Sequence, residues 1–174
     1  MKLLGPVAPK LIVLAGLPGV GKSSIARVLA ARLEATWLRV DTIEAALLRA
    51  GLAPSFETGL AAYLAANDLA SEHLQLGRTV IVDAVNGVEP AREMWRALAR
   101  RWAVPLRVVE ITCSDPAEHR RRVESRAPGT PPLRPPSWDE VVRREYRPWE
   151  EPILSLDGIE PVAKNVERIV AYCA

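Results

Sequence analysis

The residues with the clearest chemistry are a glycine-rich run near the N-terminus that ends in a lysine and two serines. Gly16 to Ser23, GLPGVGKS, follow the spacing GxxxxGK[ST]. Glycines let the backbone curl so that successive N–H groups point inward around a phosphate. The lysine ammonium then reaches the terminal phosphates, and the serine hydroxyl binds Mg²⁺. The predicted phosphate site comprises Gly16, Pro18, Gly19, Val20, Gly21, Lys22, Ser23 and Ser24.

The alternative for this segment is a glycine-rich turn that holds no ligand. The context of a phosphate-binding loop is present, because an apolar strand is expected over residues 10–15 and a helix over residues 23–33. ATP is favoured over GTP because neither an NKxD nor a DxxG segment stands at a sensible position. We therefore predict ATP and Mg²⁺ as cofactors.

A carboxylate follows the second expected strand. Asp41 comes directly after residues 36–40, and the carboxyl ends of strands in open α/β sheets converge on the binding crevice. A carboxylate there orients an attacking hydroxyl or accepts its proton. The alternative is a helix N-cap, because Asp41 and Glu44 have the spacing of a capping box. Residue type and position leave both roles open.

A second carboxylate, Asp83, ends the apolar run at residues 79–82. This is the Walker B pattern, in which the aspartate acts on Mg²⁺, usually through water. Together with the glycine-rich loop, it predicts a metal site at Ser23 and Asp83. Many strands also end in aspartate simply to make a turn. Asn86, three residues later, either hydrogen-bonds a substrate or makes the turn before Gly87.

A basic helix leads into a proline-rich stretch. Residues 119–126 contain four arginines, and Arg122 and Arg126 share a face because they are spaced i, i+4. Residues 127–136 hold five prolines and are neither helix nor central strand. We interpret residues 120–137 as a lid whose arginines, including Arg134 as a further candidate, counter the charge of a transferring phosphoryl group. The alternative is a solvated basic face.

Apolar runs and helical stretches alternate along the chain, which predicts an α/β fold with a parallel sheet. Strands are expected over residues 10–15, 36–40, 79–82, 106–112 and 153–156. Helices are expected over residues 23–33, 42–50, 59–76, 89–102, 116–126 and 162–172.

The bulk properties are those of an ordinary globular protein. The 174 residues suit a single domain over 1–174, and the formal net charge of +2 is too small to indicate nucleic acid or membrane binding. No apolar run is long enough to span a bilayer. We predict a cytoplasmic location, without nucleic acid or membrane partners.

These motifs together resemble the small P-loop kinases of the nucleoside-monophosphate-kinase-like superfamily, which includes adenylylsulfate, gluconate and polynucleotide kinases and chloramphenicol phosphotransferase. The resemblance is greatest to bacterial kinases labelled as AAA-family ATPases. Besides the glycine-rich loop, it rests on residues 39–47 (RVDTIEAAL), 77–86 (GRTVIVDAVN), Arg92 and residues 113–126 (CSDPAEHRRRVESR). The fold it implies is a P-loop NTPase three-layer sandwich, whose five-stranded parallel sheet has the order 2-3-1-4-5, with helices on both faces and a lid.

The resemblance also implies roles for single residues. Asp41 looks like the base toward the acceptor hydroxyl, and Arg122 and Arg126 look like lid arginines. Asp83 and Asn86 look like a D-x-x-N stretch near substrate or metal, with Arg92 also among the substrate contacts. An acceptor pocket is expected within residues 51–73. The proline-rich segment at residues 129–136 departs from the lid motifs of shikimate and adenylate kinases.

Three functions remain open at this point. The first is a kinase that moves the γ-phosphate of ATP to a hydroxyl of a small molecule, as a monomer or homodimer, with Lys22, Asp41, Arg122 and Arg126 as catalytic residues. The second is a nucleic-acid 5′-hydroxyl kinase, which the near-neutral charge disfavours. The third is a nucleotide-binding regulator that transfers no phosphate.

Overall fold

A parallel five-stranded sheet forms the centre of the computed structural model, which describes residues 8–125, 132–150 and 152–174. The strand order is β2-β3-β1-β4-β5, and every neighbouring pair is parallel. The expected fold class and strand order are therefore confirmed. The strands are β1 (Leu11–Ala15), β2 (Thr36–Arg39), β3 (Val80–Asp83), β4 (Leu106–Thr112) and β5 (Leu154–Asp157).

The central strand explains why the sheet is covered on both sides. All five residues of β1 are fully buried, so neither face of the strand meets solvent. In register, Leu11 of β1 lies between Val80 of β3 and Leu106 of β4. A continuous apolar run is what a strand buried on both faces requires.

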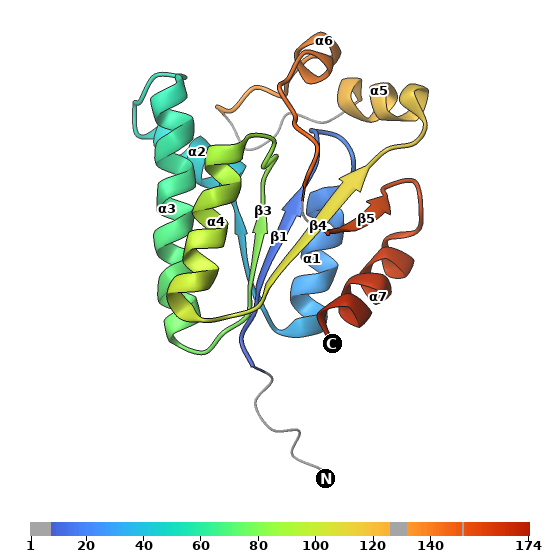
Figure 1. The fold of residues 1–174 in the computed structure, drawn as a ribbon. Helices are drawn as coiled ribbons and strands as arrows, with labels where there is room; N and C mark the ends of the chain where they lie inside the picture. Colours follow the sequence, from blue (N-terminus) through green and yellow to red (C-terminus); the bar gives the residue numbers. More distant parts are fainter. Residues whose placement is uncertain (1–7, 126–131, 151) are drawn as a thin grey trace.

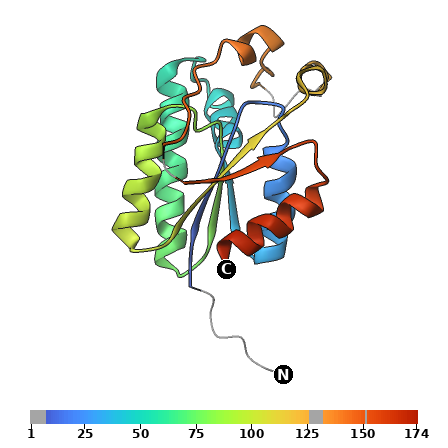
Figure 2. The ribbon, with the colours of Figure 1, turned by 45° about the vertical axis from the view of Figure 1, so that its right-hand side comes forward.

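Helices cover the two faces of the sheet and make three layers (Figures 1 and 2). One apolar core joins β1 and β3 to α3 and α4, and the other joins the opposite face of the sheet to α1 and α7. The helices are α1 (Lys22–Leu33), α2 (Val40–Arg49), α3 (Phe56–Gln75), α4 (Glu89–Trp102), α5 (Pro116–Glu124), α6 (Trp138–Val142) and α7 (Val162–Cys173). None of the helices in the described ranges is both long and apolar enough to cross a bilayer.

Two helix starts differ from expectation. Helix α2 begins at Val40 with Arg39 as N-cap, so Asp41 lies inside its first turn and makes no cap hydrogen bond. The capping-box interpretation of Asp41 and Glu44 is therefore wrong. Helix α3 begins at Phe56, three residues before the expected start, because the Ser55 hydroxyl accepts a hydrogen bond from the Thr58 N–H.

The short helix α6 was not expected. Its first turn is fixed by a capping box, in which the Ser137 hydroxyl accepts from the Glu140 N–H and the Glu140 carboxylate accepts from the Ser137 N–H. With α5, it lies above the carboxyl ends of the strands (Figure 1). Residues 126–131 of the expected lid, which include Arg126, lie outside the described residues.

Candidate functional site

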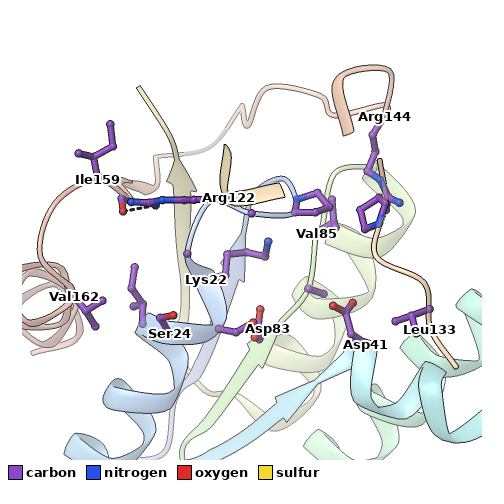
Figure 3. A pocket seen from close by; sticks show the side chains of 18 of the residues that line it. Lys22, Ser24, Asp41, Asp83, Val85, Arg122, Leu133, Arg144, Ile159 and Val162 are labelled. Carbon is purple, nitrogen blue, oxygen red and sulfur yellow. Dashed lines mark hydrogen bonds between the residues drawn. The ribbon is translucent and has the colours of Figure 1, made fainter. Parts of the chain in front are cut away.

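A cavity of about 740 Å³ opens at the carboxyl edge of the sheet, a size suited to a small ligand. Its floor is the glycine-rich loop and the start of α1, and its other walls come from α2, the end of β3, α5, residues 133–144 and residues 158–162. Side chains reach into it from both sides of Lys22 (Figure 3). Ten residues that the sequence predicts for the site line this cavity: Pro18, Gly19, Gly21, Lys22, Ser23, Ser24, Asp41, Asp83, Arg122 and Arg134.

Three glycines give the loop its shape. Gly16, Gly19 and Gly21 have φ angles of 139°, 87° and 105°, a region that side chains rarely adopt. A Cβ at Gly16 would collide with the Ile111 carbonyl oxygen, and one at Gly19 would lie 2.6 Å from the Val123 side chain on α5. The loop is therefore held between β4 and α5 by contacts that only glycine permits.

The mouth of α1 is suited to an anion. Gly21 is its N-cap residue, and no side chain in the described part of the protein caps its first turn. The N–H groups there are left for a ligand, and the helix dipole favours a negative charge. Lys22 is 8% exposed and donates a hydrogen bond of 2.9 Å to the Leu17 carbonyl. An ammonium group thus lies at the edge of a backbone cradle.

The predicted metal residues lie in the same cavity. Asp83 is 3% exposed, and its Oδ2 has no hydrogen-bond partner among the described residues. A buried carboxylate oxygen in this state needs a cation or a donor. The described chain has no cluster of three or more His, Cys, Asp or Glu residues that could hold a metal. Ser23 and Asp83 fit Mg²⁺, which commonly takes few protein ligands and completes its shell with phosphates and water.

On one side of Lys22 the cavity is lined by charged side chains. Asp41 and Glu44, from the first turns of α2, both line it. Arg144 points in from beyond α6 (Figure 3). Arg39 donates a 3.4 Å hydrogen bond to Asp41. Burial raises the pKa of Glu44, and the nearby Asp41 charge raises it further, while Arg144 lowers it. The Asp41 carboxylate thus lines the same cavity as the glycine-rich loop.

Arg122 lies on the other side of Lys22, near Ile159 (Figure 3). Its Nε donates to Glu118 at 2.7 Å and its Nη1 to the Gly158 carbonyl at 2.8 Å. Hydrogen bonds from Arg121 and Arg122 lower the pKa of Glu118 to about 2. Arg122 is thus held as part of the cavity wall, together with residues 158–162.

Asn86 and Arg92, expected to contact substrate, do not line the cavity. Asn86 is fully buried, donating to the Leu14 carbonyl and accepting from the Trp95 indole. Arg92 is 2% exposed and donates to the backbone carbonyls of Asn86, Arg147 and Pro148. Both side chains are committed to internal contacts, so the structure gives them structural roles.

None of residues 51–73, where the acceptor pocket is expected, lines this cavity, and that expectation stays a prediction. Glu44, Arg144 and Gly158 do line it and were not proposed as site residues. Gly158 directly follows the last strand. Because ligands bind at the carboxyl ends of parallel strands, its position could have predicted a place in the site. For Arg144, the sequence offered one indication, a basic pair (Arg143–Arg144) shortly after the capping-box residues Ser137 and Glu140.

Comparison with known proteins agrees with this architecture. Residues 11–135 match the sequence profile of an AAA domain family. The chain belongs to this AAA domain family. None of the curated proteins searched matches it.

Solved structures with similar folds include several kinases. The Mycobacterium tuberculosis APS kinase CysC, in complex with AMPPNP and APS, has 19% identity and a TM-score of 0.70, covering 95% of this chain and 98% of that one. A gluconokinase from Sinorhizobium meliloti 1021 has 17% identity and a TM-score of 0.68, with coverage of 95% and 91%. Kti12 from Chaetomium thermophilum, in complex with ADP-AlF3, has 23% identity and a TM-score of 0.69, with coverage of 94% and 99%. At these identities, the similarity shows a shared fold.

Proposed function

We propose that this protein is an ATP-dependent phosphotransferase that moves the γ-phosphate to a hydroxyl of a small molecule. The observation that carries the proposal is the continuity of the cavity, which joins the Lys22 cradle to the Asp41 carboxylate. A nucleotide-binding protein without transfer does not need a carboxylate-lined space beyond its phosphate site. The proposal treats the chain as one domain acting in the cytoplasm.

The nucleoside would occupy the side of the cavity formed by Arg122, Ile159 and Val162. Apolar side chains and the flat face of a guanidinium suit a purine ring. The bonds from Arg122 to Glu118 and to the Gly158 carbonyl fix that face in place. We therefore assign Arg122 to nucleotide binding in place of its expected role at the transferring group. Arg126 stays a prediction.

The triphosphate would lie over the glycine-rich loop. The N–H groups at the mouth of α1 and the Lys22 ammonium would bind its oxygens. Ser23 and Asp83 would hold Mg²⁺, directly or through water, and the bound ion would neutralise charge on the phosphate oxygens. The open Oδ2 of Asp83 supports this role.

Asp41 would act on the acceptor. The acceptor oxygen forms a bond to the γ-phosphorus while the bond from that phosphorus to the β–γ bridging oxygen breaks, and ADP leaves. The hydroxyl proton passes to the Asp41 carboxylate, which also orients the hydroxyl before transfer. Arg39, bonded to Asp41, keeps the carboxylate turned toward the cavity.

Two of the similar structures were solved with a nucleotide bound, which supports nucleotide binding by this fold. CysC was solved in complex with AMPPNP and APS, and Kti12 in complex with ADP-AlF3. A nucleic-acid kinase is less well supported, because Asp41 and Glu44 would repel the phosphates of a bound strand.

The test is acceptor-dependent release of ADP from MgATP, measured across a library of hydroxyl-bearing metabolites. We expect Asp41→Asn to lower kcat by about a hundredfold or more for any acceptor that the wild type uses, while ATP still binds. Asp68→Asn on the exposed face of α3 is the matched control. An Asp41→Asn variant with full turnover would contradict the proposal, as would a wild type that turns over no acceptor.

A further inference from the structure

His119 is a buried titratable side chain that the proposed mechanism does not use. It lies on α5, one helical turn before Val123, and is 7% exposed. Its Nε2 lies 2.8 Å from the carbonyl oxygen of Pro18, in the glycine-rich loop. A carbonyl oxygen only accepts hydrogen bonds, so Nε2 is the donor. The neutral Nε2–H tautomer and the imidazolium both donate from this nitrogen, so the bond does not require a charged ring.

This hydrogen bond reaches the middle of a tight turn. Pro18 and Gly19 form the turn, and Gly19 has a φ angle of 87°. A proline followed by a residue of positive φ is the arrangement of a type II turn. Glycine in the second position also accepts the type I arrangement, in which the peptide plane between the two residues is reversed. The residues of the turn therefore permit two directions for the Gly19 N–H.

His119 selects one of these directions. A trans peptide bond is planar, so the Pro18 carbonyl and the Gly19 N–H point to opposite sides of the chain. Because the carbonyl points to His119 on α5, the Gly19 N–H points away from α5. Both residues of the turn line the cavity that Lys22 and the mouth of α1 also line.

The imidazole ring is itself held between three parts of the protein. A Cβ at Gly19 would lie 3.4 Å from the His119 Cδ2, so the ring packs directly on the loop. On α6, the Trp138 ring meets the imidazole edge to face, with centroids 5.1 Å apart. Both α5 and α6 lie above the carboxyl ends of the strands (Figure 1). A ring fixed in this way gives the Pro18 carbonyl a donor with a fixed position.

We propose that His119 is a positioning residue for the phosphate site. Its hydrogen bond keeps the Pro18–Gly19 peptide in the orientation in which the Gly19 N–H binds a phosphate oxygen. The inference rests on the proposed function, because it assigns this N–H to the bound triphosphate. A reversed peptide would present the Pro18 carbonyl oxygen to the phosphates, and the two would repel each other.

Two substitutions separate the donor from the shape of the side chain. His119→Leu keeps an apolar side chain against Trp138 but removes the donor, whereas His119→Gln keeps an N–H donor at a similar reach. Calorimetric titrations with MgATP and with magnesium tripolyphosphate compare both variants with the wild type. We expect His119→Leu to bind each ligand about fivefold more weakly or worse, and His119→Gln to recover most of the affinity. Both ligands should respond alike, because the contact is to the phosphate chain.

A second measurement follows the peptide itself. In the amide NMR spectrum of the nucleotide-free protein, we expect one sharp Gly19 signal for the wild type and for His119→Gln. In His119→Leu, the signal should broaden or double, because the peptide plane is free to reverse.

The other histidine of the chain provides the matched control. His73 contacts Thr36 at 3.2 Å, where β2 begins, at the opposite edge of the sheet from the cavity. His73→Leu should change neither measurement. Melting temperatures show whether each variant is folded, and His119→Met serves the same purpose if His119→Leu does not fold.

The proposal is overturned if His119→Leu binds MgATP as the wild type does, if His119→Gln loses as much affinity as His119→Leu, or if the Gly19 signal is the same in all three proteins. In each of these cases, binding of MgATP by the wild type leaves the proposed nucleotide site standing. A wild type that binds neither ligand overturns the proposed function, and this inference with it.

Discussion

At the scale of single residues, the site depends on close backbone approaches that sequence motifs describe only in part. Gly16 was identified because it belongs to the glycine-rich loop. Gly158, more than a hundred residues later, supports the same loop, because a Cβ there would collide with the Val20 carbonyl oxygen. Its N–H donates to the Thr112 carbonyl, and its own carbonyl accepts from Arg122.

Gly158→Ala therefore tests how closely the wall and the loop are packed. We expect it to destabilise the fold by about 1–3 kcal/mol and to weaken ATP binding, because the loop must shift to make room. Gly59→Ala is the matched control, since Gly59 is helical with open space around its Cβ position. It should stabilise the fold by about 0.5–1 kcal/mol. Urea unfolding compares the two, and equal stabilities would contradict the packing described.

At the scale of elements, the segment that follows α6 is fastened to the body of the protein. Arg92 on α4 donates to the carbonyls of Arg147 and Pro148, and its guanidinium lies 3.8 Å from the Trp149 ring centroid. The Arg147 N–H donates to the Gly87 carbonyl. Arg144, three residues before Arg147, is thereby kept in the wall of the cavity that also contains Asp41 and Glu44.

Arg92→Lys should loosen this attachment while keeping the charge, because an ammonium cannot bond three carbonyls and stack on an indole in the same geometry. We expect the Arg147 amide to exchange its hydrogen about tenfold faster or more, as measured by NMR. Arg100→Lys, on the exposed side of α4, is the control. Unchanged exchange at Arg147 in the Arg92 variant would show that the segment is held by other contacts.

Element boundaries show what local sequence can decide. Helix α4 and strand β4 begin and end where expected. Gly87 and Pro90 mark the start of the helix, and Pro105 separates it from the apolar run of the strand. Helix α6 escaped notice since its five residues are too few to show a period; the capping box from Ser137 to Glu140 was its only local mark. Asp41 shows the opposite error, because its spacing to Glu44 suggested a helix cap that the structure does not contain.

At the scale of the whole molecule, the parallel sheet and the half of the cavity formed by the glycine-rich loop could be predicted, because a continuous apolar strand, a glycine-rich loop and a helix follow one another in sequence. The other half of the cavity, where we propose that the acceptor binds, could not. It is assembled from α2, the end of β3 and residues 133–144, which only tertiary packing brings together. Spacing also did not reveal that the Asn86 and Arg92 side chains turn into the core. The single-domain organisation and the cytoplasmic location stay predictions.

Everything proposed for this cavity requires that a triphosphate bind at the mouth of α1. The most direct test is calorimetric titration of the purified protein with MgATP, repeated for Lys22→Met and for Lys164→Met, whose lysine is exposed and bonded to Glu160. We predict one saturable site in the wild type, affinity lower by about tenfold or more in Lys22→Met, and unchanged affinity in Lys164→Met. No binding to the wild type, or equal affinity in all three proteins, would contradict the account.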